Sequence, residues 1–385
     1  MRWRYFQINQ MNRKSILLVS SAFYPEISPR SFRATELAKE FYRQGHQVVV
    51  ISKHREFDYK EFLNEFPITF KMWRKPVFSN IPDFKQKPFS LLSRAFSRLL
   101  SLLFEYPAIE EMLHVKKMLK DEKGYDLMIS FAVPFPVHWG VAQALSEKHQ
   151  IAKTWIADCG DPYMFARLDS FKKPFYFKFL EANFCSKCDY ISIPFKEMQN
   201  QFYPRFISKI RTIPQGFDFE EIRLHEGPRN NRIPVFIFAG SIIPGKRDLA
   251  SLFDFLTTIT IDFLFIVYTN QKEWFNKYKM ALGKKLEING YIERLSLIYE
   301  MSKADFLVNI DTVLDNQSNT EAVPSKLIDY ALTNRPILNI NSASFDKEIV
   351  LKFLDKDYSG QRVVEKSKYD IKKVSAKFLE LIRVN

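Results

Sequence analysis

The chain alternates short apolar runs with amphipathic segments, and this alternation limits its fold more than any other feature. Residues 16–20 form an apolar run typical of a buried strand. A helical pattern follows, which Ser31 is expected to cap and Gly45 to end, and residues 47–51 form a second apolar run. Two strands joined by a helix make a β-α-β unit, and such units build parallel sheets with right-handed crossovers.

The same alternation continues along the chain in two sets. Apolar runs at 127–131, 154–157 and 190–193 extend the first set, and runs at 235–239, 263–268, 286–290, 306–310 and 336–340 form the second. A polar segment rich in turn residues, 216–234, lies between the sets and is interpreted as a linker. The sequence therefore predicts an α/β protein with two doubly wound parallel sheets in tandem.

The net charge of +13 is concentrated in the first half of the chain. Residues 1–215 contain 33 Lys and Arg against 21 Asp and Glu, whereas residues 216–385 contain 24 against 23. A basic half suits nucleic acid or an anionic membrane surface, but the absence of a zinc-finger, RNP-like or basic-zipper pattern argues against nucleic acid. Three cysteines cannot form a disulfide framework, which suits a reducing compartment, and we expect a cytoplasmic protein.

The densest basic stretch runs from residue 71 to residue 98 and is interleaved with aromatic residues. Within residues 90–106, leucine and phenylalanine recur at helical spacing while arginine occupies the other face. This profile fits a helix that lies in a membrane interface, and it fits equally well a core-facing helix with a solvated basic side. The residues expected to contact a membrane or an acceptor are Trp73, Arg74, Lys75, Lys85, Lys87, Arg94 and Arg98.

In doubly wound sheets, ligands bind beyond the carboxyl ends of the strands, so the loops there are the expected site. The run at 235–239 is followed by Gly240 and Ser241, then by Lys246 and Arg247, and then by a helix. Glycine lets backbone N–H groups approach an anion, and two cations at a helix start add attraction, which favours a phosphate site. The alternative is an ordinary tight turn with exposed cations.

A second group of polar residues surrounds the expected start of a helix. Pro324 and Ser325 suit the first helical turn, where free N–H groups and the helix dipole favour an anion, and Lys326 adds positive charge. Glu321 in the preceding loop can accept sugar hydroxyls. Asp329 can hold both hydroxyls of a ribose, the alternative being a plain solvated helix residue. The two groups together predict a pocket for a nucleoside diphosphate that carries a sugar.

These motifs, in this order and spacing, resemble glycosyltransferase family 4, a large group of retaining enzymes. The resemblance spans nearly the whole chain and is carried by ILLVSSAFYPEISPRSFRATELAKEFYRQGHQVVVIS, IPQGFD, FAGSIIPGKRDL, GYIERLSLIYEMSKADFLVNI and VPSKLIDYALTNRPIL. It implies the GT-B fold, with two facing Rossmann-like domains and a cleft between them. It also implies transfer of a sugar from a nucleotide sugar with retention at the anomeric carbon, without a metal ion or other cofactor.

The resemblance also implies domain limits. Residues 14–212 correspond to the N-terminal acceptor domain and residues 213–368 to the C-terminal nucleotide-sugar donor domain. A helix within 369–385 is expected to pack back on the first domain. The family's frequent Gly-Gly in the opening loop is absent, so Arg30 or Arg33 is expected to reach the phosphates across the cleft.

In the donor domain, Lys246 stands where the family's cation contacts the donor diphosphate, and Arg247 is expected to share that contact. Ser241 stands where many members have Arg, so part of the usual clamp is missing. Glu321 and Asp329 occupy the two ends of the E-x7-E pattern, and Asp in place of the second Glu shortens the reach to the ribose. The full expected donor site is Gly240, Ser241, Lys246, Arg247, Val323, Pro324, Ser325, Lys326 and Asp329.

Catalytic residues are expected mainly in the first domain. The resemblance implies a catalytic or sugar-orienting His there, and His138 is the candidate, the alternative being a hydrogen-bonded helix histidine. Asp158 and Asp161 follow a strand, where carboxylates can bind acceptor or sugar hydroxyls or cap a helix. Glu321 completes the expected catalytic set.

The resulting hypothesis is a retaining glycosyltransferase of surface or capsular polysaccharide assembly. Its expected partners are a nucleotide-diphosphate sugar, a lipid-linked glycan acceptor and the anionic inner face of the cell membrane, where it would be a peripheral protein. One alternative is a GT-B sugar-nucleotide epimerase, which shares the donor pocket and needs no acceptor surface. Another is a non-catalytic nucleotide-sugar-binding scaffold, suggested by Ser241, Asp329 and the missing Gly-Gly.

Overall fold

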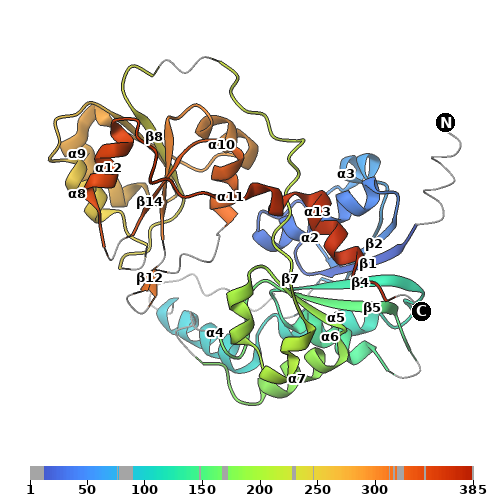
Figure 1. The fold of residues 1–385 in the computed structure, drawn as a ribbon. Coiled ribbons are helices and arrows are strands. Elements are labelled where there is room, and N and C mark those ends of the chain that lie inside the picture. The colour runs from blue at the N-terminus through green and yellow to red at the C-terminus, as the bar shows by residue number, and fades with distance from the viewer. Residues whose placement is uncertain are drawn as a thin grey trace, which may run out of the picture. The chain divides into compact units, whose positions relative to one another are not determined.

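The computed structural model describes residues 13–75, 77, 90–146, 149–166, 172–227, 231–245, 247–311, 313–314, 317–318, 325–341 and 344–383. The side chains at 90–95, 313–314, 317–318 and 325 are outside that description. The chain divides into two compact units, residues 1–217 with 370–385, and residues 218–369. Each unit is built on a parallel sheet with helices packed against it (Figure 1). None of the described helices is long and apolar enough to cross a membrane.

The sheet of the first unit has seven parallel strands in the order β3-β2-β1-β4-β5-β6-β7. They are β1 (Ser15–Ser20), β2 (Gln47–Lys53), β3 (Thr69–Trp73), β4 (Tyr125–Ala132), β5 (Ala152–Cys159), β6 (Tyr190–Ile193) and β7 (Ile210–Thr212). Ile16 of β1 pairs with Val48 on one side and with Leu127 on the other. The strand order reverses between β1 and β4, which is the topological switch point of this sheet.

Helices cover both faces of the first sheet. They are α2 (Pro29–Arg43), α3 (Lys60–Glu65), α4 (Ser90–Phe104), α5 (Ile109–Met118), α6 (Pro136–Ala144), α7 (Phe177–Lys187) and α13 (Ile371–Leu379), with short 3-10 helices η2 (Lys196–Gln201) and η3 (Pro204–Lys209). Ser31 does not cap α2 as predicted, because the helix already begins at Pro29, whose fixed φ suits the first helical position. Ser28 Oγ is the cap and accepts the N–H of Ser31 at 3.2 Å.

The core of the first unit has two layers, one on each face of the sheet. Ile16 and Leu18 point to the layer that contains α2 and α13, whereas Leu17 and Val19 point to the layer that contains α5, α6 and α7. Burial on both faces explains why the strand appears as a continuous apolar run. Phe378 of α13 belongs to the first layer, so the C-terminal helix completes this core although the second unit precedes it in the chain.

The sheet of the second unit has five parallel strands in the order β10-β9-β8-β11-β14. They are β8 (Val235–Ala239), β9 (Leu264–Tyr268), β10 (Leu286–Asn289), β11 (Phe306–Ile310) and β14 (Ile337–Ile340). Phe236 stacks on Phe306 with 4.7 Å between the ring centroids and 7° between the planes, which fixes β8 against β11. The strand order reverses between these two strands, so the switch point of the second sheet lies there.

The remaining elements of the second unit surround that sheet. Its helices are α8 (Ala250–Leu256), α9 (Asn276–Leu282), α10 (Arg294–Met301), α11 (Ser325–Leu332) and α12 (Lys347–Leu354), with 3-10 helices η4 (Lys272–Phe275), η5 (Gly283–Lys285) and η6 (Lys366–Tyr369). The strands β12 (Val313–Leu314) and β13 (Gln317–Ser318) form a separate antiparallel pair. The predicted fold class, two doubly wound parallel sheets in tandem, is confirmed.

Candidate functional site

The loop after β8 begins at the switch point of the second sheet. Gly240 directly follows β8 and has a φ of 147°, a conformation that residues with a side chain rarely adopt. A Cβ at this position would meet Phe238 at 3.6 Å and Lys326 at 3.9 Å, which are ordinary contacts. The backbone conformation, rather than lack of space, therefore favours glycine where the sequence predicted close approach to a phosphate.

Lys326 of α11 places a buried ammonium group beside this loop. Its Nζ makes no hydrogen bond to any residue that the structure describes, and it lies 5.1 Å from the centroid of the Phe238 ring. The pKa of Lys326 is lowered to about 7, mainly by burial and then by the positive charges of Arg247 and Arg362, while Asp311 opposes the shift. A buried ammonium that makes no hydrogen bond to a described residue is unfavourable, so this position favours the binding of an anion.

Asp311 and Arg362 belong to the same cluster, and neither was predicted. Arg362 Nη1 donates to Asp311 Oδ1 at 2.7 Å, and Asn339 Nδ2 donates to Asp311 Oδ2 at 2.6 Å. The Arg362 amide donates to the Ile337 carbonyl at 2.9 Å, which aligns its segment with β14. Asp311 directly follows a predicted strand, so the rule that ligands bind beyond the carboxyl ends of strands could have identified it. Arg362 lies in a segment without strand or helix periodicity, and no local signal places it beside β11.

The loop after β8 also supplies Arg247. The backbone N–H of Arg247 donates to the carbonyl of Ile243 at 2.7 Å, and the reverse bond measures 2.9 Å, so the loop closes as a tight turn. Ser241 is exposed. The predicted residues Lys246, Glu321, Val323 and Pro324 and the side chain of Ser325 lie outside the described part of the chain. Of the predicted donor residues, the structure brings together Gly240, Arg247 and Lys326.

Asp329, one turn into α11, is held by Arg294 at the start of α10. The Nε and Nη2 atoms of Arg294 lie 3.1 and 2.6 Å from Asp329 Oδ1. Burial raises the pKa of Asp329, and the charge of Arg294 opposes that shift. The alternative of a plain solvated helix residue is wrong, because the Asp329 side chain is only 18% exposed. A ribose contact by this residue would involve a carboxylate that Arg294 already orients.

In the first unit, Asp158 and Arg33 form a buried ion pair. Arg33 Nε and Nη2 each lie 2.7 Å from a different carboxylate oxygen of Asp158, and Ser192 Oγ donates to the same carboxylate at 2.6 Å. Arg33 also donates to the carbonyls of Pro214 and Ile213 at 2.6 and 3.0 Å. The sequence predicted a phosphate contact for Arg33 and hydroxyl contacts for Asp158. The structure instead turns these side chains toward each other in the core.

His138 lies in the core as well. Its Nδ1 is 2.8 Å from Ser130 Oγ, and its Nε2 is 3.6 Å from Cys159 Sγ. Trp155 Nε1 donates to the same Ser130 hydroxyl at 2.8 Å. Burial lowers the pKa of His138 to about 4, against the opposite effect of Asp158, so the ring is neutral at pH 7. This arrangement agrees with the alternative of a hydrogen-bonded helix histidine.

Asp161 and Arg30 form an accessible pair at the carboxyl end of β5. Arg30 Nη2 lies 2.6 Å from Asp161 Oδ2, and the Asp161 side chain is exposed. A Cβ on Gly160 would lie 1.5 Å from Arg30 Nη1, so the missing side chain provides the space that the guanidinium occupies. Of the residues predicted for catalysis or for phosphate contact in the first unit, Asp161 is exposed and Arg30 is partly exposed.

The residues of the predicted basic stretch differ in exposure, and some of them lie outside the described part of the chain. Trp73 is buried in the core of the first unit, contrary to its expected contact with a membrane or acceptor. Arg74 is exposed, Lys75 is exposed and lies 2.8 Å from Glu56, and Arg98 is exposed on α4. Lys85 and Lys87 are outside the described residues, as is the side chain of Arg94.

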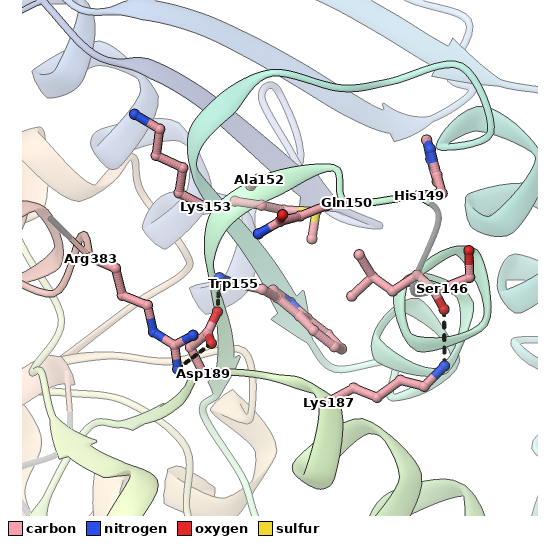
Figure 2. A pocket seen from close by; sticks show the side chains of 11 residues that line it. Ser146, His149, Gln150, Ala152, Lys153, Trp155, Lys187, Asp189 and Arg383 are labelled. Carbon is pink, nitrogen blue, oxygen red and sulfur yellow. Dashed lines mark hydrogen bonds and ion pairs between the residues drawn. The ribbon is translucent and has the colours of Figure 1, made fainter. Parts of the chain in front are cut away.

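A hollow of about 600 Å³ lies at the amino ends of β5 and β6, the edge opposite to the expected ligand edge (Figure 2). Arg383 Nη2 pairs with Asp189 at 2.7 Å, and Lys153 pairs with Asp126 at 2.9 Å. Lys187 donates to the Leu145 carbonyl at 3.1 Å. Because these cations are already paired and the hollow is at the amino ends of the strands, we do not assign the donor to it.

The two doubly wound parallel sheets, taken together with the solved structures that match the chain, give the fold class as GT-B, the fold of a large class of glycosyltransferases. No protein-family model and no curated protein matches the sequence. Solved structures match it over 96% of its length. The lipopolysaccharide outer core galactosyltransferase WaaB, in its apo form, matches with a TM-score of 0.59 at 12% identity over 99% of that chain.

Two further matches were solved with ligands. HepE from Anabaena, in complex with UDP and glucose, matches with a TM-score of 0.59 at 11% identity over 99% of that chain. A mutant of S. aureus TarM, in complex with fondaparinux, alpha-GlcNAc-glycerol and UDP, matches with a TM-score of 0.53 at 12% identity over its whole length. At these identities the likeness establishes the fold.

Proposed function

We propose that the chain is a glycosyltransferase that uses a nucleotide-diphosphate sugar, and that the second unit binds the donor diphosphate. The observation that carries this proposal is the buried ammonium of Lys326, which has no hydrogen-bond partner among the described residues. The charges of Arg247 and Arg362 act on it from within the same unit. Asp311 acts on Lys326 in the opposite direction to these two arginines, and a pyrophosphate would add negative charge beside the buried amine.

The same cluster suits the chemistry of the reaction. Departure of a nucleoside diphosphate develops negative charge on its oxygens, and cations already fixed in position stabilise that charge without reorganisation. We therefore propose transfer that needs no metal ion, with Lys326 and Arg247 at the leaving group. In a retaining reaction, the acceptor hydroxyl attacks from the face that the phosphate leaves, and the phosphate accepts its proton. Asp161 and Arg30 are the candidates in the first unit for orienting the acceptor.

The acceptor in this proposal is a lipid-linked glycan at the inner face of the cell membrane. Support comes from WaaB, whose name places it in lipopolysaccharide outer core synthesis, and from the basic first half of this chain. UDP occurs in the HepE and TarM structures, so UDP is the first nucleotide to test. Glu321 and Asp329 stay predicted contacts to the sugar and the ribose.

Binding of UDP to Lys326→Met tests the donor site. The variant replaces a buried lysine that makes no hydrogen bond to any described residue by an apolar side chain of similar length, so its unliganded form should be at least as stable as the wild type. Saturating UDP at ~100 times its dissociation constant should stabilise the wild type by roughly 2.7 kcal/mol. The variant should lose most of that stabilisation. Lys279→Met, which changes an exposed lysine of the same unit, is the matched control and should respond like the wild type.

A variant that is stable without ligand and still binds UDP with unchanged affinity would refute the assignment of the donor site to Lys326. Incubation with a UDP-sugar and no acceptor gives a second readout. Slow hydrolysis that disappears in Lys326→Met supports a transferase. Interconversion of the sugar would instead identify an epimerase, and binding without turnover on any acceptor would favour a scaffold protein.

A further inference from the structure

Large apolar side chains are exposed on two neighbouring elements of the first unit. Phe96 and Phe104 of α4 are 61% and 56% exposed, and Leu99 between them is 49% exposed. Phe175 and Phe179, just before and within α7, are 71% and 63% exposed. We call these five residues the aromatic face. Because Phe96, Leu99 and Phe104 are solvent-exposed, the core-facing alternative for the predicted helix does not hold for them.

Contacts between the two elements join these residues into one surface. Tyr176 donates a hydrogen bond to the Leu103 carbonyl, and Lys173 pairs with Glu105 directly after α4. Tyr163 donates to the same Glu105 carboxylate at 2.9 Å, which anchors the junction to the core. Figure 1 shows α4 and α7 on the same side of the first unit.

The exposure of Phe175 and Phe179 follows from the way α7 packs. The inward side of α7 is occupied by Phe177, which stacks on Trp139 at 5.5 Å and 21°, and by the buried Phe184. Phe175 lies in the turn before α7 and Phe179 in the first turn of the helix, and both side chains are exposed instead of taking part in that packing. The core is thus complete without them, and they project into solvent.

The two segments that carry the aromatic face are basic, and Glu105, which follows Phe104, is paired with Lys173. Residues 96–104 and 172–179 include Arg98, Lys172 and Lys178 but no Asp or Glu, and these three cations are exposed. Lys178 Nζ lies 5.0 Å from the centroid of the Phe179 ring, so charge and aromatic surface are adjacent. Aromatic side chains among cations match the boundary of an anionic bilayer, where the rings enter the interface and the cations meet lipid phosphates. A second copy of this basic surface would repel it.

We propose that the aromatic face binds an anionic lipid bilayer, with Phe175 and Phe179 inserted beside the α4 side chains. This inference deepens the membrane partner of the proposed function and rests on it. It adds the segment 172–179, which lies outside the basic stretch that the sequence singled out. The surface would hold the first unit at the membrane where a lipid-linked acceptor is present.

Flotation with phosphatidylcholine vesicles, with and without phosphatidylglycerol, tests the proposal. The wild type should float with the anionic vesicles only, and less as salt is added, because exposed charges are screened. The double variant Phe175→Glu/Phe179→Glu should lose at least about tenfold in vesicle affinity, because it removes two inserting rings and places two carboxylates against the anionic lipid surface. Met280→Glu alters a side chain that is 92% exposed on the second unit and should float like the wild type.

Two further measurements separate the possible outcomes. Lys172→Glu/Lys178→Glu should also lose flotation, whereas the exposed pair in Lys279→Glu/Lys284→Glu should not. Stabilisation by UDP should be unchanged in every variant, which shows that each is folded and that donor binding is independent of the aromatic face. Flotation that survives the phenylalanine double variant, or a concentration-dependent dimer that disappears in it, would overturn the proposal. Flotation without UDP binding would overturn the donor assignment alone.

Discussion

Arg33 and Asp158 meet through two hydrogen bonds of 2.7 Å, and both side chains are almost completely buried. The pair joins α2 to β5, and Arg33 extends it to the carbonyls of Ile213 and Pro214 after β7. Its guanidinium also lies 5.5 Å from the centroid of the Phe378 ring in α13. One ion pair therefore connects parts of the first unit that are far apart in the sequence.

Asp158→Ala should destabilise the first unit by about 3–5 kcal/mol, because it leaves the Arg33 guanidinium buried without its counter-charge. Trp73, Trp139 and Trp155 lie in this unit and Trp274 lies in the second, so urea unfolding followed by fluorescence reports mainly on the first unit. Arg33→Met/Asp158→Leu should lose less than the sum of the two single variants, since the two residues act as a pair. Additive losses would mean that the contact contributes little.

His138 should make the first unit less stable as the pH falls from about 6.5 to 4. Its pKa in the folded protein is lowered to about 4 by burial, whereas an unfolded chain has a value near 6.5. The unfolded state therefore takes up a proton first, and roughly 3 kcal/mol of stability is lost across that range. The variant His138→Gln should lack this loss of stability. The difference between the wild-type and variant profiles of stability against pH should therefore contain it. A His138 imidazole that titrates near pH 6.5 in NMR spectra would contradict the expectation.

Gly240→Ala should reduce the stability of the second unit by about 1–3 kcal/mol through its backbone conformation alone. The added methyl group would make only ordinary contacts, but a φ of 147° is strained for alanine. Gly290→Ala is the matched control in the same unit, because its φ is not positive and its nearest neighbour at 3.4 Å is the flexible end of Lys272. Equal urea midpoints for the two variants would show that the turn after β8 adapts without cost.

The strands were predictable because they are buried on both faces. A run such as residues 16–19 is apolar at every position, and no partner needs to be known to identify it. The carboxyl-end rule likewise indicated the loop at Gly240, since it depends only on the order of strands and helices. These features are local in the sequence, and the sheet topology confirms the fold class they predicted.

The orientation of polar side chains was not predictable in the same way. Arg33 and Asp158 are 125 residues apart, and nothing in either neighbourhood indicates that they pair in the core. His138 follows a strand as a catalytic residue would, yet its ring packs between Phe135 and Phe184. Position along a strand indicates which edge of the sheet a residue occupies, whereas its partner depends on packing between distant segments.

Binding of UDP should be coupled to proton uptake by Lys326. At pH 8.5 the free protein holds this side chain largely neutral, because its pKa is about 7 when no anion is bound. A pyrophosphate beside the ammonium favours the charged form and raises that pKa, so close to one proton should be taken up per UDP bound. Calorimetry at pH 8.5 in two buffers of different ionisation enthalpy measures this number, at a pH where UDP itself is fully ionised.

The unliganded protein should show the matching effect on stability. An unfolded lysine keeps its proton up to about pH 10.4, whereas the folded site releases it near pH 7, so the unfolded state binds more protons between these values. Stability should therefore rise with pH across this window, by up to about 1.4 kcal/mol per pH unit. Both the proton uptake on UDP binding and the rise of stability with pH should vanish in Lys326→Met and persist in Lys279→Met. Uptake that is unchanged in Lys326→Met would assign the proton to another group and remove the main support for the donor site.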